Sequence, residues 1–504
     1  MSDSNSRDVT QGTGPVRRSI YLPDKLDAIQ SFVEFCRGQG RPKYPLEVYV
    51  EVSSLCNLKC GMCLDFSPLN RNRGVRNNAT SGQIRLDQHL PQLTDVLKHA
   101  LYVHCSGNTG ETTTHKDFPW IIDMLGRFEV AIDFLTNGML LTRELVELLV
   151  GKGVYKVTVS FSGATASDYE AMYIGGNFEK VLAGLKRLQQ AKNETKSRYP
   201  LVEINSIGFK HHIDKLDKFV ELMAAHGVST IYVKPMVEFP EIMGELYGHR
   251  SVIRPWVEGN VVARAQDLAK AYGLHLYMDV DTANNEADYE QQLAQHRLLY
   301  ETRSQGPLQI IPIENLKELA LARQRARGPE AKQSFKVKAE TNRAEPDLHP
   351  LSSTAEVERI MSFMPLVDIA AMDDPHCMQP FKTLYLCQSG LVKACNFAGG
   401  SPTLGDCSTT DALDIWNGNG YKSIHEAILS GSYSKTMCAD CLKHQLGMTH
   451  HWIDHMLPNY LDWHIRTYGA FTIADANHLM AQLGPLGTNS EIVANHAAKR
   501  PAKS

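Results

Sequence analysis

The sequence has no long apolar run, little net charge and no secretion signal. No stretch of about 18 apolar residues free of charges, as a membrane-spanning helix requires, occurs in the 504 residues. The N-terminal segment MSDSNSRDVTQGTGPVRR is polar and lacks the apolar core of a signal peptide. Lysine and arginine (52) nearly balance aspartate and glutamate (56), so charge gives no case for a nucleic-acid partner. We expect a cytoplasmic protein without membrane or nucleic-acid partners.

Cysteine is abundant by comparison, and it is grouped. Of the eleven cysteines, three lie between residues 56 and 63 and six lie between residues 377 and 441. In a reducing compartment, such groups are more often metal ligands or catalytic thiols than disulfides. The two groups therefore indicate two sites of chemistry in a chain long enough for two or three domains.

Short β-prone runs alternate with amphipathic helical stretches from residue 46 to about residue 280. The helical runs include RELVELLVGKG and FEKVLAGLKRLQQA, in which apolar residues recur at three- and four-residue intervals. This alternation predicts an α/β fold with a parallel sheet of βα units, specifically a partial (βα)6 barrel whose functional residues follow the strand ends. The candidate strands are residues 46–53, 100–107, 130–138, 155–163, 202–209, 230–236 and 274–280.

The composition changes along the chain divide it into five parts. The charged, helix-prone middle segment is interpreted as a helical linker or insertion, with a solvated spacer as the alternative. The cysteine-rich segment after it is expected to form a small α+β domain. The parts are an N-terminal extension (1–45), the barrel (46–282), the linker (283–375), the small domain (376–450) and a C-terminal helical tail (451–504).

The first cysteine group stands in EVSSLCNLKCGMCLDF, directly after the first predicted strand. Cys56, Cys60 and Cys63 lie on a stretch short enough to turn three sulfurs toward one metal centre. A structural zinc site uses four ligands, and no fourth thiol lies nearby. A [4Fe–4S] cluster on three thiolates would leave one iron open to a small molecule. Three structural or zinc-binding cysteines are the alternative.

This C-x3-C-x2-C loop resembles the signature of the radical S-adenosylmethionine (radical SAM) enzymes. CSGNTGETTTHKDF resembles the family's Gly-Gly-Glu segment, with Gly110 and Glu111 at its centre and Thr112 where many members have proline. FLTNGMLLT resembles the family's third-strand turn, with Asn137 in the middle. VSFSGATASDYEAMYIGGNFEKVLAGLKRL is similar to the fourth-strand ribose-contacting segment, with Ser162 where many relatives carry aspartate.

The resemblance implies a reaction and a set of cofactor contacts. In this family, the open iron chelates SAM, and one electron cleaves SAM to methionine and a 5′-deoxyadenosyl radical, which abstracts hydrogen from a carbon. Backbone at the Gly-Glu pair would hold the methionine amine. The SAM-contacting candidates are Gly110, Glu111, Asn137, Ser160, Ser162, Asn205 and Met236.

The second cysteine group combines a predicted hairpin with a C-x2-C pair. In CMQPFKTLYLCQSGLVKAC, two strands flank a tight turn at Ser389-Gly390 and bring Cys395 back toward Cys377. With Cys438 and Cys441 the segment resembles the SPASM/twitch auxiliary-cluster domain of the same family, in its one-cluster form. The resemblance implies a second [4Fe–4S] cluster with all four irons ligated and a role in electron transfer. Zinc would suit the same ligands.

Several polar residues remain outside these two sets. Cys387 and Cys407 lie in the small domain and are candidate hydrogen-atom or proton donors to a substrate radical, with ordinary buried cysteines as the alternative. His211 and His212 follow the fifth predicted strand, where a base would be useful, and a simple turn is the alternative.

The predicted function is oxidative or redox tailoring of a small metabolite, of the sugar, aminoglycoside or nucleoside type. The extension over residues 1–45 is too short for the leader-recognition domain that many peptide-modifying relatives carry. The first alternative is a peptide maturase that crosslinks or epimerises residues, with the segment 283–375 recognising the peptide. The second is a non-enzymatic iron–sulfur or zinc protein. A flavodoxin or ferredoxin is expected to supply the electron.

Overall fold

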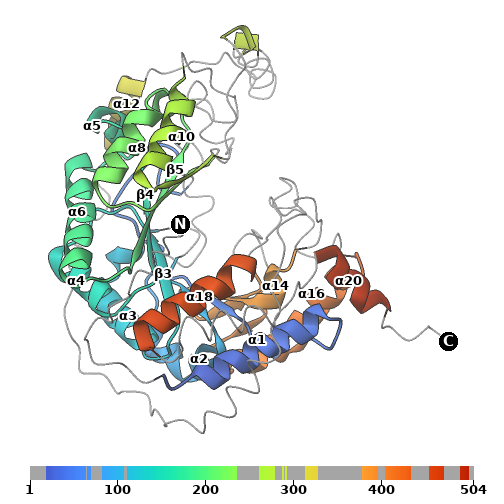
Figure 1. The fold of residues 1–504 in the computed structure, drawn as a ribbon. Helices are drawn as coiled ribbons and strands as arrows, with labels where there is room; N and C mark the ends of the chain where they lie inside the picture. Colours follow the sequence, from blue (N-terminus) through green and yellow to red (C-terminus); the bar gives the residue numbers. More distant parts are fainter. Residues whose placement is uncertain are drawn as a thin grey trace, which may run out of the picture.

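In the part of the chain that the computed structural model describes, ten strands form one sheet with helices around it (Figure 1). The strand order is β10-β9-β8-β1-β2-β3-β4-β5-β6-β7. The structure describes residues 19–63, 65–69, 82–106, 110–234, 260–278, 286–288, 290–291, 294, 313–326, 377–395, 403–432, 453–469 and 489–498.

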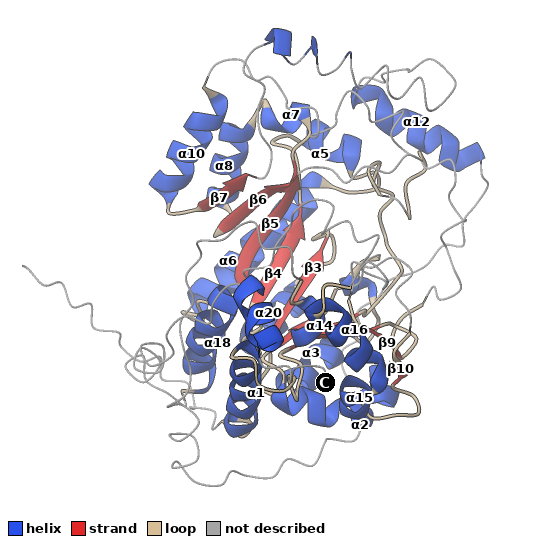
Figure 2. Cartoon of the chain, turned by 90° about the vertical axis from the view of Figure 1, so that its right-hand side faces the viewer, coloured by secondary structure: helices blue, strands red, loops and turns tan. Residues whose placement is uncertain are grey.

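Seven strands run parallel and neighbour one another in chain order, which confirms the predicted parallel sheet of βα units. Each lies within one of the seven predicted runs, to within a residue, and β3–β7 form a twisted fan (Figure 2). Among the described strands, β7 and β10 end the sheet, so it is open. The seven strands are β1 (Glu47–Val50), β2 (Tyr102–His104), β3 (Ala131–Thr136), β4 (Lys156–Ser160), β5 (Leu201–Ile207), β6 (Thr230–Lys234) and β7 (His275–Met278).

One face of the sheet is apolar and covered by helices, and the other is polar. In β5, Val202 and Ile204 are buried while Glu203 and Asn205 are only partly covered, as the two-residue period of a strand requires. Each buried Val or Ile contributes roughly 1.5–3 kcal/mol to folding. The helices of this part are α2 (Leu86–His99), α3 (Phe118–Gly126), α4 (Arg143–Gly151), α5 (Ala166–Met172), α6 (Phe178–Glu194), α7 (Lys210–Ile213), α8 (Leu216–Ala225) and α10 (Val261–Tyr272), with the 3-10 helix η1 (Thr112–Thr114).

The cysteine-rich segment extends the barrel sheet. After α14 (Gln379–Lys382), strand β8 (Thr383–Leu386) pairs parallel with β1, and β9 (Leu391–Lys393) returns antiparallel to it. This confirms the predicted hairpin, whose turn uses Gly390 at φ +87°. The strand β10 (Gly405–Asp406) pairs with β9. The sequence did not predict that β8 covers the free edge of β1, which would otherwise leave backbone groups unpaired.

A buried row of opposite charges joins this added strand to the barrel. Lys382 Nζ lies 2.7 Å from Glu47 Oε1, and both side chains are almost fully buried. Glu47 lies 3.6 Å from His104, whose Nδ1 bonds Asp133 at 2.8 Å. Burial alone would lower the pKa of His104, but Asp133 and Glu47 outweigh it and raise the pKa to about 9. The imidazole is therefore a cation between two carboxylates at neutral pH.

Helix α18 (Ile453–Tyr468) covers the amino-terminal ends of the strands. Trp463 donates from Nε1 to Gly153 O at 2.7 Å, and Tyr102 donates from its hydroxyl to Met456 O at 2.9 Å. With α1 (Leu22–Cys36), this helix belongs to the lower arm of the molecule (Figure 1). The opposite edge, where β1 runs into the cysteine loop, is thereby left to the candidate site.

The remaining described helices are α12 (Ile313–Ala326), α15 (Ala412–Asn417), α16 (Asn419–Leu429) and α20 (Asn489–Ala498). Helix α15 packs against α2, and Trp416 donates from Nε1 to Pro42 O at 3.0 Å. None of the helices in the described ranges is both long enough and apolar enough to cross a membrane.

Candidate metal and cofactor site

The loop that carries Cys56, Cys60 and Cys63 is held by backbone hydrogen bonds to the end of α5. It leaves the sheet at the carboxyl end of β1. Lys59 N donates to Ile174 O at 2.9 Å, and Gly61 N donates to Met172 O at 2.7 Å. These two bonds flank Cys60, so its place is fixed by main-chain geometry.

The three thiols are close enough to influence one another, and Cys56 and Cys60 are desolvated. Burial raises the pKa of Cys56 to about 12, and it raises that of Cys60 well above the ordinary value, with further increases from the other two sulfurs. Leu58 N donates to Cys56 Sγ and Phe66 N donates to Cys63 Sγ, each at 3.4 Å. Such N–H groups stabilise a thiolate once a metal replaces its proton.

This donor set fits an iron–sulfur cluster better than a single ion. Within the described ranges, no three Cys, His, Asp or Glu side chains converge closely enough to hold one metal ion. Thiolates around one zinc each lie about 2.3 Å from it and therefore crowd together. A cubane cluster binds each cysteine at a different iron, so its ligand sulfurs lie farther apart.

The segment around Gly110 and Glu111 packs directly on the cysteine loop. Glu111 N donates to Leu55 O at 2.7 Å. Gly110 has φ +92°, and a Cβ there would lie 2.1 Å from Ser53 O, so only glycine fits. The buried Glu111 carboxylate accepts from Thr136 Oγ1 at 2.6 Å. Burial raises its pKa, although these hydrogen bonds oppose the change.

Asn137 links the third-strand turn to both segments. Its backbone N–H donates to Glu111 Oε2 at 2.6 Å, and its Nδ2 donates to Asn57 Oδ1, in the cysteine loop, at 2.7 Å. The structure thus brings together the cysteine loop, the Gly-Glu segment and the Thr-Asn-Gly turn. Asn137 and Glu111 have protein partners here, which makes them positioning residues for the loop.

Ser160 and Asn205 lie side by side at the carboxyl ends of β4 and β5. They are register partners, and both are partly covered. Asn205 Oδ1 is buried and has no hydrogen-bond partner among the described residues. A buried acceptor without a donor costs roughly 1–3 kcal/mol, so this oxygen fits a ligand that brings an O–H or N–H group. Met236 lies outside the described residues.

Ser162 and His212 belong to one buried polar chain. His212 Nε2 lies 2.7 Å from Ser206 Oγ, which donates to Ser162 Oγ at 3.2 Å. Ser162 also lies 3.2 Å from Tyr173 Oη. Burial lowers the pKa of His212 to about 3, so it stays neutral. The structure therefore gives His212 internal partners, as a structural turn residue has, and places Ser162 in the same network.

The second cysteine group is described in part. Cys377 precedes α14 and is partly buried, and Cys395 follows β9 and is buried. Both sulfurs lie near enough to Lys382 to affect its pKa, which burial lowers overall. Cys438 and Cys441 lie outside the described residues. The hairpin thus brings two of the four predicted ligands to one neighbourhood.

Cys387 and Cys407 are both buried in the small domain. Burial raises the pKa of Cys387 to about 11 and that of Cys407 to about 12. Cys407 is fully enclosed in the apolar core. Their role as donors to a substrate radical stays a prediction.

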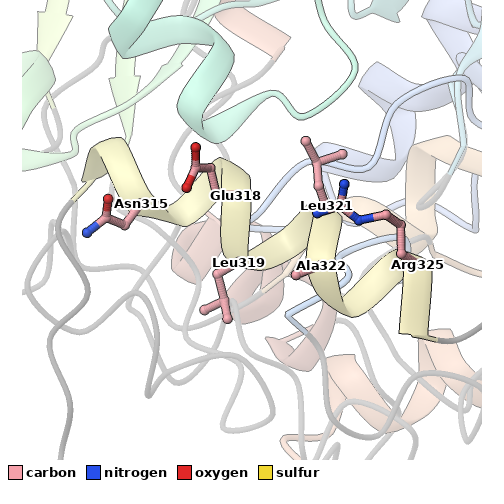
Figure 3. A pocket seen from close by; sticks show the side chains of 6 residues that line it. All are labelled: Asn315, Glu318, Leu319, Leu321, Ala322 and Arg325. Carbon is pink, nitrogen blue, oxygen red and sulfur yellow. The ribbon is translucent and has the colours of Figure 1, made fainter.

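Helix α12, in the predicted linker, packs on α5 beside the cysteine loop. Leu316 and Ala320 are buried, Lys317 pairs with Glu170 at 3.0 Å, and Arg323 donates to Leu69 O at 3.2 Å. A cavity of about 580 Å³ is lined by other residues of this helix, Asn315, Glu318, Leu319, Leu321, Ala322 and Arg325 (Figure 3). This part of the linker is thus packed against the barrel.

Two sets of residues were not predicted from the sequence: the buried row of charges at β1 and β8, and the two tyrosines beside the cysteine loop. Glu47, His104 and Lys382 look like ordinary strand and helix residues, and their pairing depends on β8 joining β1. Tyr169 and Tyr173 lie within the segment that resembles the fourth-strand signature, and this position is the feature from which they could have been predicted.

Two segments match known families. Residues 50–223 match the radical SAM superfamily, and residues 377–442 match SPASM, an iron–sulfur cluster-binding domain. These domains imply a [4Fe–4S] cluster that binds SAM, an auxiliary cluster, and SAM itself as cofactors.

Curated relatives match about a third of the chain. Mycofactocin maturase MftC of Mycolicibacterium smegmatis is 27% identical over 187 residues, 37% of this chain and 43% of that protein. PqqA peptide cyclase of Rhodopseudomonas palustris is 28% identical over 183 residues, 36% and 44% of the two chains. AdoMet-dependent heme synthase of Methanosarcina barkeri is 28% identical over 188 residues, which are 36% of this chain and 48% of that protein. The chain thus spans less than half of the length of these relatives.

Solved structures are similar over more of the chain but at lower identity. Streptococcus suis SuiB bound to S-adenosylmethionine is 16% identical, with a TM-score of 0.40 over 79% of this chain and 71% of that one. The structure of anSMEcpe with bound AdoMet is 12% identical in sequence, with a TM-score of 0.40 over 86% of this chain and 99% of that one.

Proposed function

We propose that this chain, which carries a radical SAM domain followed by a SPASM domain, cleaves SAM reductively and abstracts hydrogen from a C–H bond of a peptide substrate. The observation that carries the proposal is the loop at the carboxyl end of β1, where three thiols lie close together and main-chain bonds to the end of α5 fix the position of Cys60. Functional residues of parallel βα sheets collect at this edge.

The residues of the site are proposed to have three roles: holding the cluster, positioning the loop and contacting SAM. Cys56, Cys60 and Cys63 would hold the cluster, which with SAM supplies one-electron cleavage and a 5′-deoxyadenosyl radical. Glu111 holds the third-strand turn through Thr136 and so keeps the loop and that turn in register. The remaining contacts to SAM are assigned to Ser160 and the Asn205 carbonyl, with Gly110, Asn137, Ser162 and Met236 as the other candidates.

The substrate class rests on the relatives. A peptide cyclase and a maturase are among them, which supports the peptide alternative over the small-metabolite substrate predicted from the short N-terminal extension. A heme synthase is also among them, so a small-molecule substrate retains some support. Helix α12 lies beside the cysteine loop and lines a cavity, which supports a role for the segment 283–375 in substrate recognition.

The small domain is proposed to hold the auxiliary cluster. Cys377 and Cys395, with Cys438 and Cys441, would supply four thiolates, so no iron is left open and electron transfer is the expected role. The buried Lys382 adds a positive charge beside two of these ligands. A flavodoxin or ferredoxin as electron donor remains a prediction.

The activity is tested by 5′-deoxyadenosine formation. Anaerobically reconstituted protein is mixed with SAM and dithionite, and the nucleoside is quantified by chromatography. Wild type is expected to form it, and Cys60→Ala is expected to form none. The control is Cys36→Ala, which removes a buried thiol on α1 and should keep the activity. Equal yields from wild type and Cys60→Ala would reject the proposal.

The substrate class is tested separately by mass spectrometry. Short peptides encoded beside the gene are incubated with the active protein, SAM and reductant. A mass change in a peptide that depends on Cys60 supports the peptide substrate. Uncoupled 5′-deoxyadenosine formation with every such peptide, together with coupled turnover of a small metabolite, would overturn it.

A further inference from the structure

Tyr169 presents a buried hydroxyl for which the described part of the chain offers no hydrogen-bond partner. Its side chain is fully buried, and no hydrogen-bond partner for its Oη exists among the described residues. The ring stacks on that of Tyr173, with centroids 4.6 Å apart and planes 9° from parallel. Leaving such a hydroxyl unsatisfied costs roughly 1–3 kcal/mol, so a partner beyond the described residues is expected.

The two tyrosines lie against Cys60. The bonds from Lys59 N to Ile174 O and from Gly61 N to Met172 O place Tyr173 opposite Cys60, one residue from each bond. Cys60 lies close enough to affect both phenols electrostatically, so Tyr169 as well as Tyr173 is near this sulfur. A phenol hydroxyl is a hydrogen-bond donor, so both can donate toward this ligand.

Gly176 leaves room for the side chain of Tyr169, because a glycine has no Cβ. A Cβ on Gly176 would lie 2.9 Å from Tyr169 Cε1 and 3.1 Å from its Oη. The phenol ring thus stacks on the rings of Tyr173 and Phe161, and the backbone of the turn after α5 lies at its Cε1 and Oη atoms. Its hydroxyl has a defined position and little freedom to find another partner.

A directed hydrogen-bond chain leads to Tyr173. Gly163 N–H donates to His212 Nδ1 at 3.1 Å, so the neutral imidazole carries its proton on Nε2 and donates to Ser206. Ser206 donates to Ser162. Ser162 then has its own proton left to donate to Tyr173 Oη at 3.2 Å. With Tyr173 as the acceptor in this chain, its own O–H is left to donate, and no acceptor for it occurs among the described residues.

We infer that the hydroxyls of Tyr169 and Tyr173 donate hydrogen bonds to the sulfurs of the cluster on the cysteine loop, at Cys60 or a bridging sulfide, and raise its reduction potential. The inference rests on the proposed function, because it needs a cluster on Cys56, Cys60 and Cys63. Hydrogen bonds to cluster sulfurs favour the reduced, more negative state. The two residues are positioning and tuning groups for electron uptake.

The test is an EPR-monitored redox titration without SAM. The relevant signal is the one whose spectrum changes when SAM is added to a separate sample. In Tyr169→Phe and Tyr173→Phe, the ratio of reduced to oxidised cluster at the wild-type midpoint is expected to fall at least threefold, which for one electron is about 28 mV. The control is Tyr460→Phe on α18, which loses a hydroxyl bonded to Glu129 O and should keep the wild-type midpoint.

Iron content and a second readout separate the outcomes. Pulsed EPR in D2O is expected to show exchangeable protons near the cluster in wild type and fewer in each variant. An unchanged midpoint in both variants at wild-type iron content would overturn the inference alone. A shift seen only with SAM present would also overturn it, since the hydroxyls would then serve SAM. Wild-type protein without iron on the cysteine loop would instead refute the proposed function.

Discussion

The buried imidazolium of His104 predicts a contribution to stability that falls as the pH rises through the neutral range. Its pKa is raised from 6.5 to about 9 by Asp133 and Glu47, which outweigh burial. Because the folded state holds the proton more tightly than the unfolded state, the stabilisation is fully present below pH 6.5. It is lost as the pH rises through 9. Between pH 6.5 and 8.5 the free energy of unfolding should fall by roughly 2 kcal/mol from this group.

The assay is urea unfolding at pH 6.5, 7.5 and 8.5, comparing wild type with His104→Gln. Unfolded cysteines, whose ordinary pKa is about 8.5, also titrate toward the upper end of this range, but they do so in both proteins and cancel in the difference. The difference between the two proteins isolates His104, because cluster loss affects both equally. The difference in the free energy of unfolding between wild type and His104→Gln should shrink by roughly 2 kcal/mol from pH 6.5 to pH 8.5.

A matched control is His226→Gln. His226 directly follows α8, and its ring bonds the carbonyl of Leu222 at 2.7 Å. This variant loses an imidazole that, among the described residues, has no ion pair with a carboxylate. A constant difference between wild type and His104→Gln, with the same dependence of unfolding on urea, would refute the charged state of His104.

Three further outcomes are expected. Lys382→Met should lower the free energy of unfolding by roughly 3–5 kcal/mol because it removes the nearer of the two cations beside the buried Glu47 and leaves only His104, 3.6 Å away. Adding Glu47→Gln should recover most of this loss in urea titrations, and a double variant as unstable as the single one would contradict the pairing. Gly110→Ala should abolish 5′-deoxyadenosine formation, since its Cβ would collide with Ser53 O at 2.1 Å; near wild-type yield would disprove the close packing. Glu111→Gln turns an amide toward backbone donors, so the yield of 5′-deoxyadenosine should fall at least tenfold, which corresponds to about 1.4 kcal/mol. An unchanged yield at full iron content would argue against the positioning role of Glu111.

The barrel was predictable because its signals are local. Each strand is a short run of β-branched and aromatic residues, and each amphipathic helix shows its period within one segment. The hairpin turn at Gly390 is equally local, since positive φ favours glycine there. The cysteine loop was recognised because its spacing and its place after a strand both lie within sixteen residues.

The pairing of β8 with β1 was not predictable in the same way. It joins residues more than three hundred positions apart, and short parallel strands carry no mark of their partner. The buried pair Glu47–Lys382 follows from that pairing, so it was missed with it. The roles of Glu111 and Asn137 depended on side-chain direction, which spacing does not specify. Family resemblance suggested cofactor contacts, and the structure adds their bonds to the loop.

The most direct test of the account is iron and acid-labile sulfide per chain after anaerobic reconstitution. Wild type is compared with a variant in which Cys56, Cys60 and Cys63 are all replaced by alanine. One cluster in each cysteine group predicts roughly eight irons in wild type and about four in the variant. About four irons falling to none, with one zinc retained, would leave the SAM cluster but remove the auxiliary one. Equal iron content in the two proteins would contradict the cluster on the cysteine loop, and with it the proposed chemistry.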